Sequence, residues 1–283
     1  MKKEKKKKIW YGVLCGCILA AAICIVVPAG RKASLYREAE QFLQTEDTVR
    51  AYSVFSGLGG YKDAEKRAED LIRNDPALPY RTLAKGDRLT FGTYEQDNDE
   101  KDGKEPVEWI VLDRIDDEIL LLCAVCLDCR TYNDVPFEPV TWENSAVRGW
   151  LNGTFYDTAF SQEEKKRIMT AENRNPDQSE AGTDGGADTS DCVFLLCEKE
   201  AGIYLGNEMD QEYIGKAEAT AYAASRGAHT GEDGVAEWWL RTPGEYAYTA
   251  QFVDSGGKTY IAGAYVDIAF GIRPAIWLHA GAV

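Results

Sequence analysis

Five cysteines beyond residue 120 are the side chains best suited to metal or redox chemistry. They are Cys123, Cys126, Cys129, Cys192 and Cys197. The first three recur at every third position, and closely spaced thiolates bind zinc or iron. A bacterial iron–sulfur run needs a further cysteine at position 133, where Asn133 stands.

The alternatives for these cysteines differ in what they require. Cys192 or Cys197 would complete a zinc site. A single disulfide such as Cys129–Cys192 is the other alternative, and the odd number of cysteines leaves at least one thiol unpaired. Cys123 ends an apolar run, which is typical of a small buried hydrophobic residue. We therefore predict no metal site and no cofactor.

Acid–base and nucleophilic motifs are scarce. His229 and His279 are the two histidines, they lie far apart, and no Gly-x-Ser-x-Gly motif occurs. We predict that the protein is not an enzyme. The alternative is a zinc- or iron-dependent enzyme that uses Cys123, Cys126 and Cys129.

Two acidic loops offer oxygen ligands for calcium. Residues 97–103 resemble half an EF-hand loop, but Lys101 takes the fifth ligand position and Asp102 replaces the glycine of the sharp turn. Residues 183–191 are the better candidate, because they are rich in glycine and acidic. Their carboxylates are Asp184, Asp188 and Asp191. Solvated acidic loops outnumber calcium sites, so neither loop is assigned as one.

Tyrosines crowd residues 244–270, between a Pro243-Gly244 turn signal and the C-terminal strand. Turns place flanking side chains at the surface, and tyrosine offers rigid, amphipathic contact area. Sheet faces lined by alternation are the other interpretation of these rings. We predict that this face binds a neutral or cationic ligand. The candidate ligand-binding residues are Glu245, Tyr246, Tyr248, Gln251, Tyr260 and Tyr265.

Charge is unevenly distributed along the 283 residues. Residues 1–8 hold six lysines and one glutamate, whereas the remainder holds 26 basic and 46 acidic side chains. Such an acidic surface repels phosphate, which excludes nucleic acid as a partner.

An uncharged run over residues 9–27 follows the lysines. As a helix it would be about 28 Å long, close to the thickness of the hydrocarbon core of a bilayer. The lysines keep residues 1–8 in the cytoplasm and send the C-terminal part out. The length of the run favours a single-pass signal anchor at 9–28 over the alternative, a signal peptide cleaved near Val27-Pro28-Ala29.

Residues 34–75 show helical periodicity. Leu35, Ala39 and Phe42 share one helical face, and Asp47 is a candidate N-cap for the next helix. The stretch 51–64 resembles a tetratricopeptide-type helical hairpin of about one and a half repeats. Because solenoid grooves need about three repeats, we expect a spacer. A structural envelope scaffold acting through this hairpin is the alternative.

Residues 80–283 predict one α+β domain, with short strands at both ends and helices between them. Apolar runs at 107–112 and 118–125 flank an acidic turn and predict a hairpin. Helices are expected after Thr141 and after Ser161, where Ser161 and Glu164 form a capping box. A third helix is expected at 216–226, and further strands at 89–93, 191–196, 238–240, 250–253, 259–262 and 272–278.

A series of motifs in this domain resembles a known family. They include Glu108-Trp109-x-Val111-Leu112-Asp113, Thr141-Trp142-Glu143-Asn144-Ser145, Trp238-Trp239-Leu240-Arg241 and Gly271-Ile272-Arg273-Pro274-Ala275. In this order they resemble the bacterial DUF6273 family of mostly exported domains, over residues 87–279.

That family in turn resembles the C-type lectin-like fold of formylglycine-generating enzymes and retroelement-diversified receptors. The resemblance rests on Leu240-Arg241 and Gly271-Ile272-Arg273, and it implies that Arg241 and Arg273 are scaffold residues. Those enzymes carry reactive cysteines in the region matching 242–270, which holds none here. The resemblance implies binding by residues 244–270, just before the closing strand, and not that enzyme activity.

These observations together predict a membrane-anchored, extracytoplasmic binding protein without catalytic activity. Its expected partner is an unknown protein or glycan at the cell surface.

Overall fold

The computed structural model describes residues 29–206, 213–231 and 233–282. The lysine tail at 1–8 and the predicted anchor at 9–28 lie outside the described residues. Within the described ranges, no helix has the length and apolar character needed to cross a bilayer.

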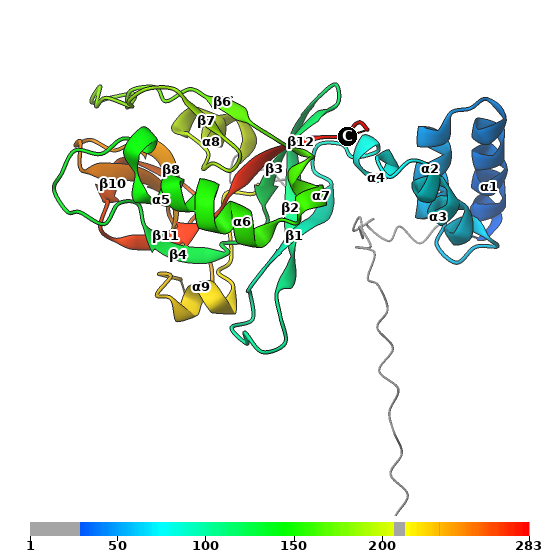
Figure 1. The fold of residues 1–283 in the computed structure, drawn as a ribbon, viewed down its shortest axis with the longest axis horizontal. Coiled ribbons are helices and arrows are strands. Elements are labelled where there is room, and N and C mark those ends of the chain that lie inside the picture. Colours follow the sequence, from blue (N-terminus) through cyan, green and yellow to red (C-terminus); the bar gives the residue numbers. More distant parts are fainter. Residues whose placement is uncertain (1–28, 207–212, 232, 283) are drawn as a thin grey trace, which may run out of the picture.

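Four helices come first in the chain: three lie at one end of the molecule, and the short fourth lies between them and the rest of the fold (Figure 1). They are α1 (Ala29–Gln44), α2 (Thr48–Gly57), α3 (Ala64–Asn74) and α4 (Leu78–Arg81). Asp47 caps α2 by accepting a hydrogen bond from the Arg50 amide, as predicted. Apolar side chains of all four helices form a hydrophobic cluster centred on Phe55 and Leu58. These helices therefore bury a small core of their own.

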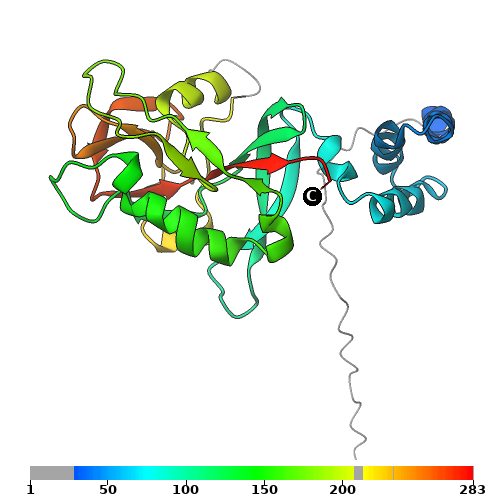
Figure 2. The same cartoon turned by 45° about the horizontal axis from the view of Figure 1, so that its top comes forward.

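The rest of the described chain forms two five-stranded sheets and a two-stranded ribbon (Figures 1 and 2). The first sheet has the order β1 (Arg88–Tyr94), β2 (Glu105–Ile115), β3 (Glu118–Cys123), β12 (Ala275–His279) and β5 (Ile168–Met169). The second has the order β10 (Thr259–Tyr265), β9 (Thr249–Val253), β8 (Trp238–Pro243), β11 (Ala269–Ile272) and β4 (Asp128–Thr131). The ribbon pairs β6 (Ala171–Asn173) with β7 (Thr189–Asp191).

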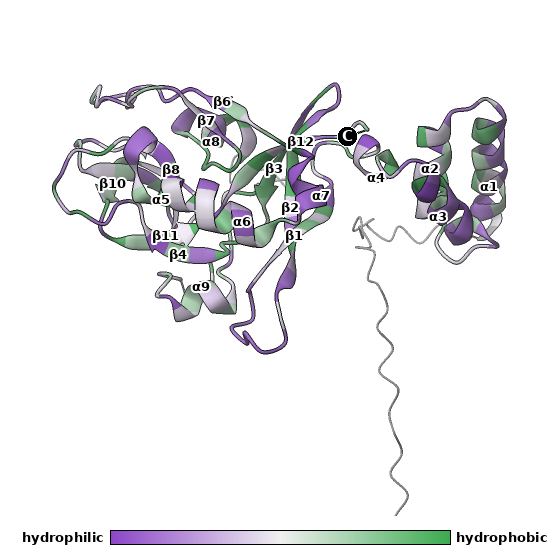
Figure 3. Ribbon diagram, in the orientation of Figure 1, coloured by the Kyte–Doolittle hydropathy of each residue, from purple (hydrophilic) through white to green (hydrophobic). Residues whose placement is uncertain are grey.

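Short helices connect and cover these strands. They are η1 (Trp142–Asn144), α5 (Ala146–Trp150), η2 (Leu151–Phe155), α6 (Tyr156–Ala159), α7 (Gln162–Lys165), α8 (Glu198–Tyr204) and α9 (Ala221–Ser225). The predicted capping box of Ser161 and Glu164 opens α7. Hydrophobic residues are concentrated on β3 and the middle of β2, whereas α3 is mostly hydrophilic (Figure 3). The predicted α+β class is confirmed.

Two stretches of chain, β3–β4 and β11–β12, run antiparallel to each other and pass from one sheet to the other. In the first sheet β3 pairs antiparallel with β12, and in the second β4 pairs antiparallel with β11. Ile272 lies opposite Asp128, but Ala275 lies opposite Leu122, so the β3–β4 segment has extra residues at this point. The chain passes from one sheet to the other at Arg273-Pro274.

Arg273 occupies this junction and is 1% exposed. Its Nε donates to the Cys123 carbonyl at 2.8 Å and its Nη1 to the Ile214 carbonyl at 2.7 Å. The guanidinium lies 5.0 Å from the centroid of the Trp238 ring. No carboxylate in the described part of the chain pairs with it, and burial lowers its pKa to about 10. Arg273 therefore contacts the first sheet at the Cys123 carbonyl, the second at the Trp238 ring and the intervening chain at the Ile214 carbonyl, as expected of a scaffold residue.

Arg241 is also buried, but it pairs with an acid. Its guanidinium contacts both carboxylate oxygens of Glu200, at 2.5 and 2.8 Å. It also donates to the Leu195 and Arg174 carbonyls, which fastens β8 to the α8 side of the domain.

Three element predictions were wrong in extent. The strand expected at 272–278 divides into β11 and β12, because Pro274 has no amide hydrogen with which to continue a ladder. Beyond Asp191, the strand expected at 191–196 forms a single bridge, from Phe194 to Ala275. The helix expected at 216–226 begins at Ala221, since the residues before it form bridges with other segments.

We expect Arg273→Ala to reduce the free energy of unfolding by roughly 2–4 kcal/mol, because it leaves two buried carbonyls without donors. Urea unfolding followed by tryptophan fluorescence measures this change. Arg73→Ala, at an exposed arginine in α3, is the control and should change stability by less than about 0.5 kcal/mol. Equal effects of the two substitutions would contradict the role of Arg273 at the junction.

Candidate functional site

An exposed group of aromatic rings lies at the β10 end of the second sheet. Tyr246 and Tyr248 come from the β8–β9 turn, Tyr265 ends β10, and Phe137 comes from the loop between β4 and η1. We call these four residues the aromatic patch.

The tyrosines of the patch form a stack. The rings of Tyr246 and Tyr248 are 5.6 Å apart and 6° from parallel, and those of Tyr248 and Tyr265 are 6.0 Å apart and 14° from parallel. Phe137 packs edge-on against Tyr248 and Tyr265, at 5.7 and 5.4 Å. Such pairs contribute about 0.5–1.5 kcal/mol each beyond their buried area, so the rings hold one another in place.

These rings nevertheless remain open to solvent. Phe137 is 66% exposed, Tyr246 51% and Tyr265 47%, while Tyr248 is half-buried between its neighbours. Contiguous exposed apolar surface of this kind is typical of a binding site.

The backbone fixes the turn that carries the tyrosines. The Gly244 amide donates to the Thr249 carbonyl at 2.8 Å, and the Glu245 amide donates to the Ala262 carbonyl at 2.8 Å. A Cβ at Gly244 would lie 2.4 Å from the Thr249 hydroxyl, so no larger residue fits there without movement. The Val140 amide donates to the Ala247 carbonyl at 2.8 Å, which ties the Phe137 loop to the same turn.

Acidic residues lie next to the patch residues in the sequence. Glu138, Glu245 and Asp267 are exposed, and each is within two residues of a patch ring. The Glu245 carboxylate raises the pKa of the Tyr246 hydroxyl, with a smaller contribution from desolvation. The aromatic patch therefore has the Glu245 carboxylate beside it, and the exposed Glu138 and Asp267 lie close to it in the sequence.

The six sequence candidates fall into different places. Tyr246, Tyr248 and Tyr265 come together in the patch, with Glu245 beside them. Tyr260 is exposed, but its ring packs on Phe252 at 5.2 Å, outside the patch.

The surface position expected for Gln251 is wrong. Its exposed fraction is 0%, and its Nε2 donates to Glu198 at 2.8 Å. It lies on β9, which is flanked on both edges by β8 and β10. Sequence reasoning also missed Phe137, although Pro136 and Pro139 on either side marked a surface loop.

The cysteine cluster does not form a ligand set. The five cysteines beyond residue 120 are free thiols, and Cys123, Cys126 and Cys129 are buried. Burial raises the pKa of Cys123 and of Cys126 to about 12, which opposes the thiolate that a metal needs. In the described ranges, no three of the cysteines have their sulfurs within 4.8 Å of one another.

In the better calcium candidate, residues 183–191, the carboxylates of Asp188 and Asp191 already accept hydrogen bonds from the protein. Asp191 is buried and accepts from Trp142 Nε1 at 2.9 Å and from Arg148 Nε at 2.6 Å. Asp188 accepts from the Asn175 amide. Asp191 therefore fastens the β6–β7 ribbon to η1 and α5, and the carboxylates of this loop do not converge on one point.

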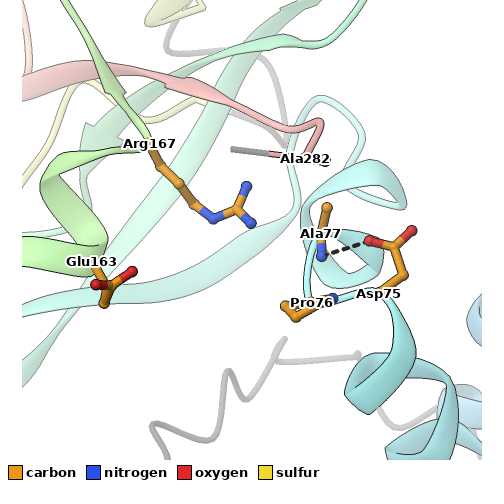
Figure 4. Close-up of a pocket in the computed structure, with 6 residues that line it drawn as sticks. All are labelled: Asp75, Pro76, Ala77, Glu163, Arg167 and Ala282. Carbon is orange, nitrogen blue, oxygen red and sulfur yellow. Dashed lines mark hydrogen bonds between the residues drawn. The ribbon is translucent and has the colours of Figure 1, made fainter.

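A pocket of about 300 Å³ lies between α4 and α7, where Arg167 extends towards the segment from Asp75 to Ala77 (Figure 4). Its charged groups are engaged with the protein. Arg167 donates to the His279 and Gly281 carbonyls, and Asp75 pairs with Arg81 at 2.6 Å. The pocket thus lies between the helical end and the sheets. The charged groups of Arg167 and Asp75 are both used in contacts within the protein.

The structure thus defines an α+β protein with an aromatic surface patch. Residues 116–280 match the family described as a domain of unknown function, DUF6273, and the chain belongs to that family. No curated protein and no solved structure matches the chain. The likeness to the C-type lectin-like fold stays a prediction.

We expect iodoacetamide to label Cys192, which is partly exposed, before the four buried thiols of Cys123, Cys126, Cys129 and Cys197. Mass spectrometry of the native protein measures the order, and urea-unfolded protein is the control. Labelling of Cys123, Cys126 and Cys129 that increases after a chelator is added would contradict this prediction and favour a bound metal.

Proposed function

We propose that the protein is a non-catalytic binding protein and that the aromatic patch is its binding surface. The observation that carries the proposal is the stack of Tyr246, Tyr248 and Tyr265 at the surface, with Phe137 packed against its edge. A folded protein gains more by burying such rings than by exposing them, so their exposure favours a role in recognition.

The arrangement suits binding because the rings are already ordered. A tyrosine that is held by its neighbours loses little side-chain entropy when a ligand covers it. The backbone hydrogen bonds of the β8–β9 turn extend this order to the main chain. Ligand contacts would therefore be made without a large rearrangement.

The chemistry of the surface limits the class of ligand. Flat rings offer stacking faces to sugar rings and to apolar side chains, and the hydroxyls offer hydrogen bonds. Glu138, Glu245 and Asp267 repel anions and attract cations. A protein segment or a glycan that is neutral or cationic fits this surface, whereas a nucleic acid does not.

The proposed location is the outer face of the cell membrane. Support comes from the sequence, in which a lysine cluster precedes the uncharged run at 9–27. The aromatic patch would then face the extracytoplasmic space.

We expect Tyr246→Ala to lose binding at least tenfold and to lower the melting temperature by no more than a few degrees, since it removes an exposed ring that stacks on Tyr248 alone, a pair that contributes about 0.5–1.5 kcal/mol. Binding is measured on arrays of neutral and amino-sugar glycans and of cationic peptides. The matched control is Tyr260→Ala, an exposed tyrosine of β10 outside the patch. The proposal fails if no array probe binds, if Tyr246→Ala and Tyr260→Ala bind alike, or if Tyr246→Ala is unfolded at the temperature of the binding assay.

We also expect protease added to intact cells to digest residues 80–283, because the lysine cluster directs this part outward. Immunoblotting with an antibody to the C-terminal domain measures the loss. Cells opened by detergent serve as the control for protease sensitivity. Protection in intact cells, with digestion after opening, would contradict the proposed topology.

A further inference from the structure

Three carboxylates converge at the base of the loop that joins β1 to β2. Glu95 and Asp97 lie just after β1, and Glu105 begins β2. One oxygen of each lies within 4.8 Å of the others. In the described parts of the chain, no other set of three acidic, histidine or cysteine side chains comes this close. We call these three residues the hairpin carboxylates.

Glu95 provides a second observation, separate from the clustering, that points to a bound ligand. It is 8% exposed, and its Oε1 is buried without any hydrogen-bond partner among the described residues. A buried carboxylate oxygen without a partner is costly, and native proteins rarely leave one. A cation beside Glu95 would satisfy it.

The charges around the hairpin carboxylates also favour a bound cation. Within the described ranges, no lysine or arginine forms an ion pair with any of the three. The negative charges therefore lack a counterion from these parts of the protein.

Backbone contacts hold one of the carboxylates in position. Glu105 Oε2 accepts from the Gln96 amide at 2.6 Å and from the Asp97 amide at 3.3 Å. These bonds hold the Glu105 carboxylate across the hairpin from Glu95.

We propose that Glu95, Asp97 and Glu105 bind a calcium ion. Calcium takes oxygen ligands at about 2.3–2.6 Å, so two oxygens bound to one ion lie at most about 5 Å apart, as these do. The set has no nitrogen or sulfur donor, which disfavours zinc and copper. Calcium tolerates the irregular geometry of a hairpin loop, whereas magnesium requires a near-octahedral site.

A bound ion would also act on α9. The Tyr222 amide donates to the Gln96 carbonyl at 2.9 Å, and the Ser225 hydroxyl contacts Asn98 at 3.0 Å. The loop and α9 are therefore already connected, and calcium would fix the loop side of this contact. The site is separate from the aromatic patch and does not depend on its proposed role.

The test uses the full chain in detergent, stripped of metal with a chelator and then dialysed. Equilibrium dialysis with radioactive calcium measures binding, and thermal unfolding measures stability with about 5 mM CaCl₂ or MgCl₂. That concentration exceeds the dissociation constants of about 10⁻⁴–10⁻³ M that are typical of extracellular calcium modules. We expect stoichiometric calcium and a rise of several degrees in melting temperature with CaCl₂, larger than with MgCl₂.

Two substitutions identify the ligands. Glu95→Gln and Asp97→Asn should each weaken calcium binding at least tenfold, and Glu95→Gln should not lower the melting temperature in the absence of calcium, because it removes a buried charge. Asp184→Asn removes one exposed charge from the other acidic loop and should bind calcium like the unmodified chain. The proposal is overturned if the unmodified chain binds no calcium, or if Asp184→Asn weakens binding as much as Asp97→Asn does.

Discussion

The two sheets of this protein meet at a buried positive charge that no carboxylate among the described residues pairs with. Arg273 is enclosed where the chain leaves β11 and enters β12, and main-chain carbonyls satisfy its guanidinium. A buried charge is tolerated only where its hydrogen bonds are met, so the carbonyls of Cys123 and Ile214 must stay in place. The path of the chain on both sides of the junction follows from that requirement.

The position of Arg273 also affects the aromatic patch, because the second sheet connects the two. Because β11 is fixed beside β4 and β8, the order of the remaining strands leaves β10 at the edge. The β8–β9 turn and the end of β10 then meet on one side, and the loop after β4 comes to the same place. Rings from three separate segments form one surface only when this order is kept.

Local features of the fold could be predicted from the sequence, whereas long-range placement could not. The β2–β3 hairpin, the cap at Asp47 and the capping box at Ser161 follow from neighbouring residues. The burial of Gln251 depends on which strands flank β9, and the place of Phe137 depends on a loop distant in sequence. The sequence pattern drew attention to Asp97 in the 97–103 loop but not to Glu95 and Glu105, because Glu105 comes close to Glu95 only after the hairpin has formed.

The edge strand β10 raises a separate matter, the stability of the folded protein against self-association. An exposed edge with aromatic side chains is a template on which a second chain can add a strand. Here the pairing of β10 with β9 is interrupted between Tyr260 and Ala264, where Gly263 has a positive φ of 78°. Gln178 and the Glu245 amide also occupy the carbonyls of Ile261 and Ala262. The bulge and the occupied carbonyls leave fewer backbone hydrogen bonds for an added strand from a second chain. The tyrosines can therefore stay exposed without making the β10 edge prone to aggregation.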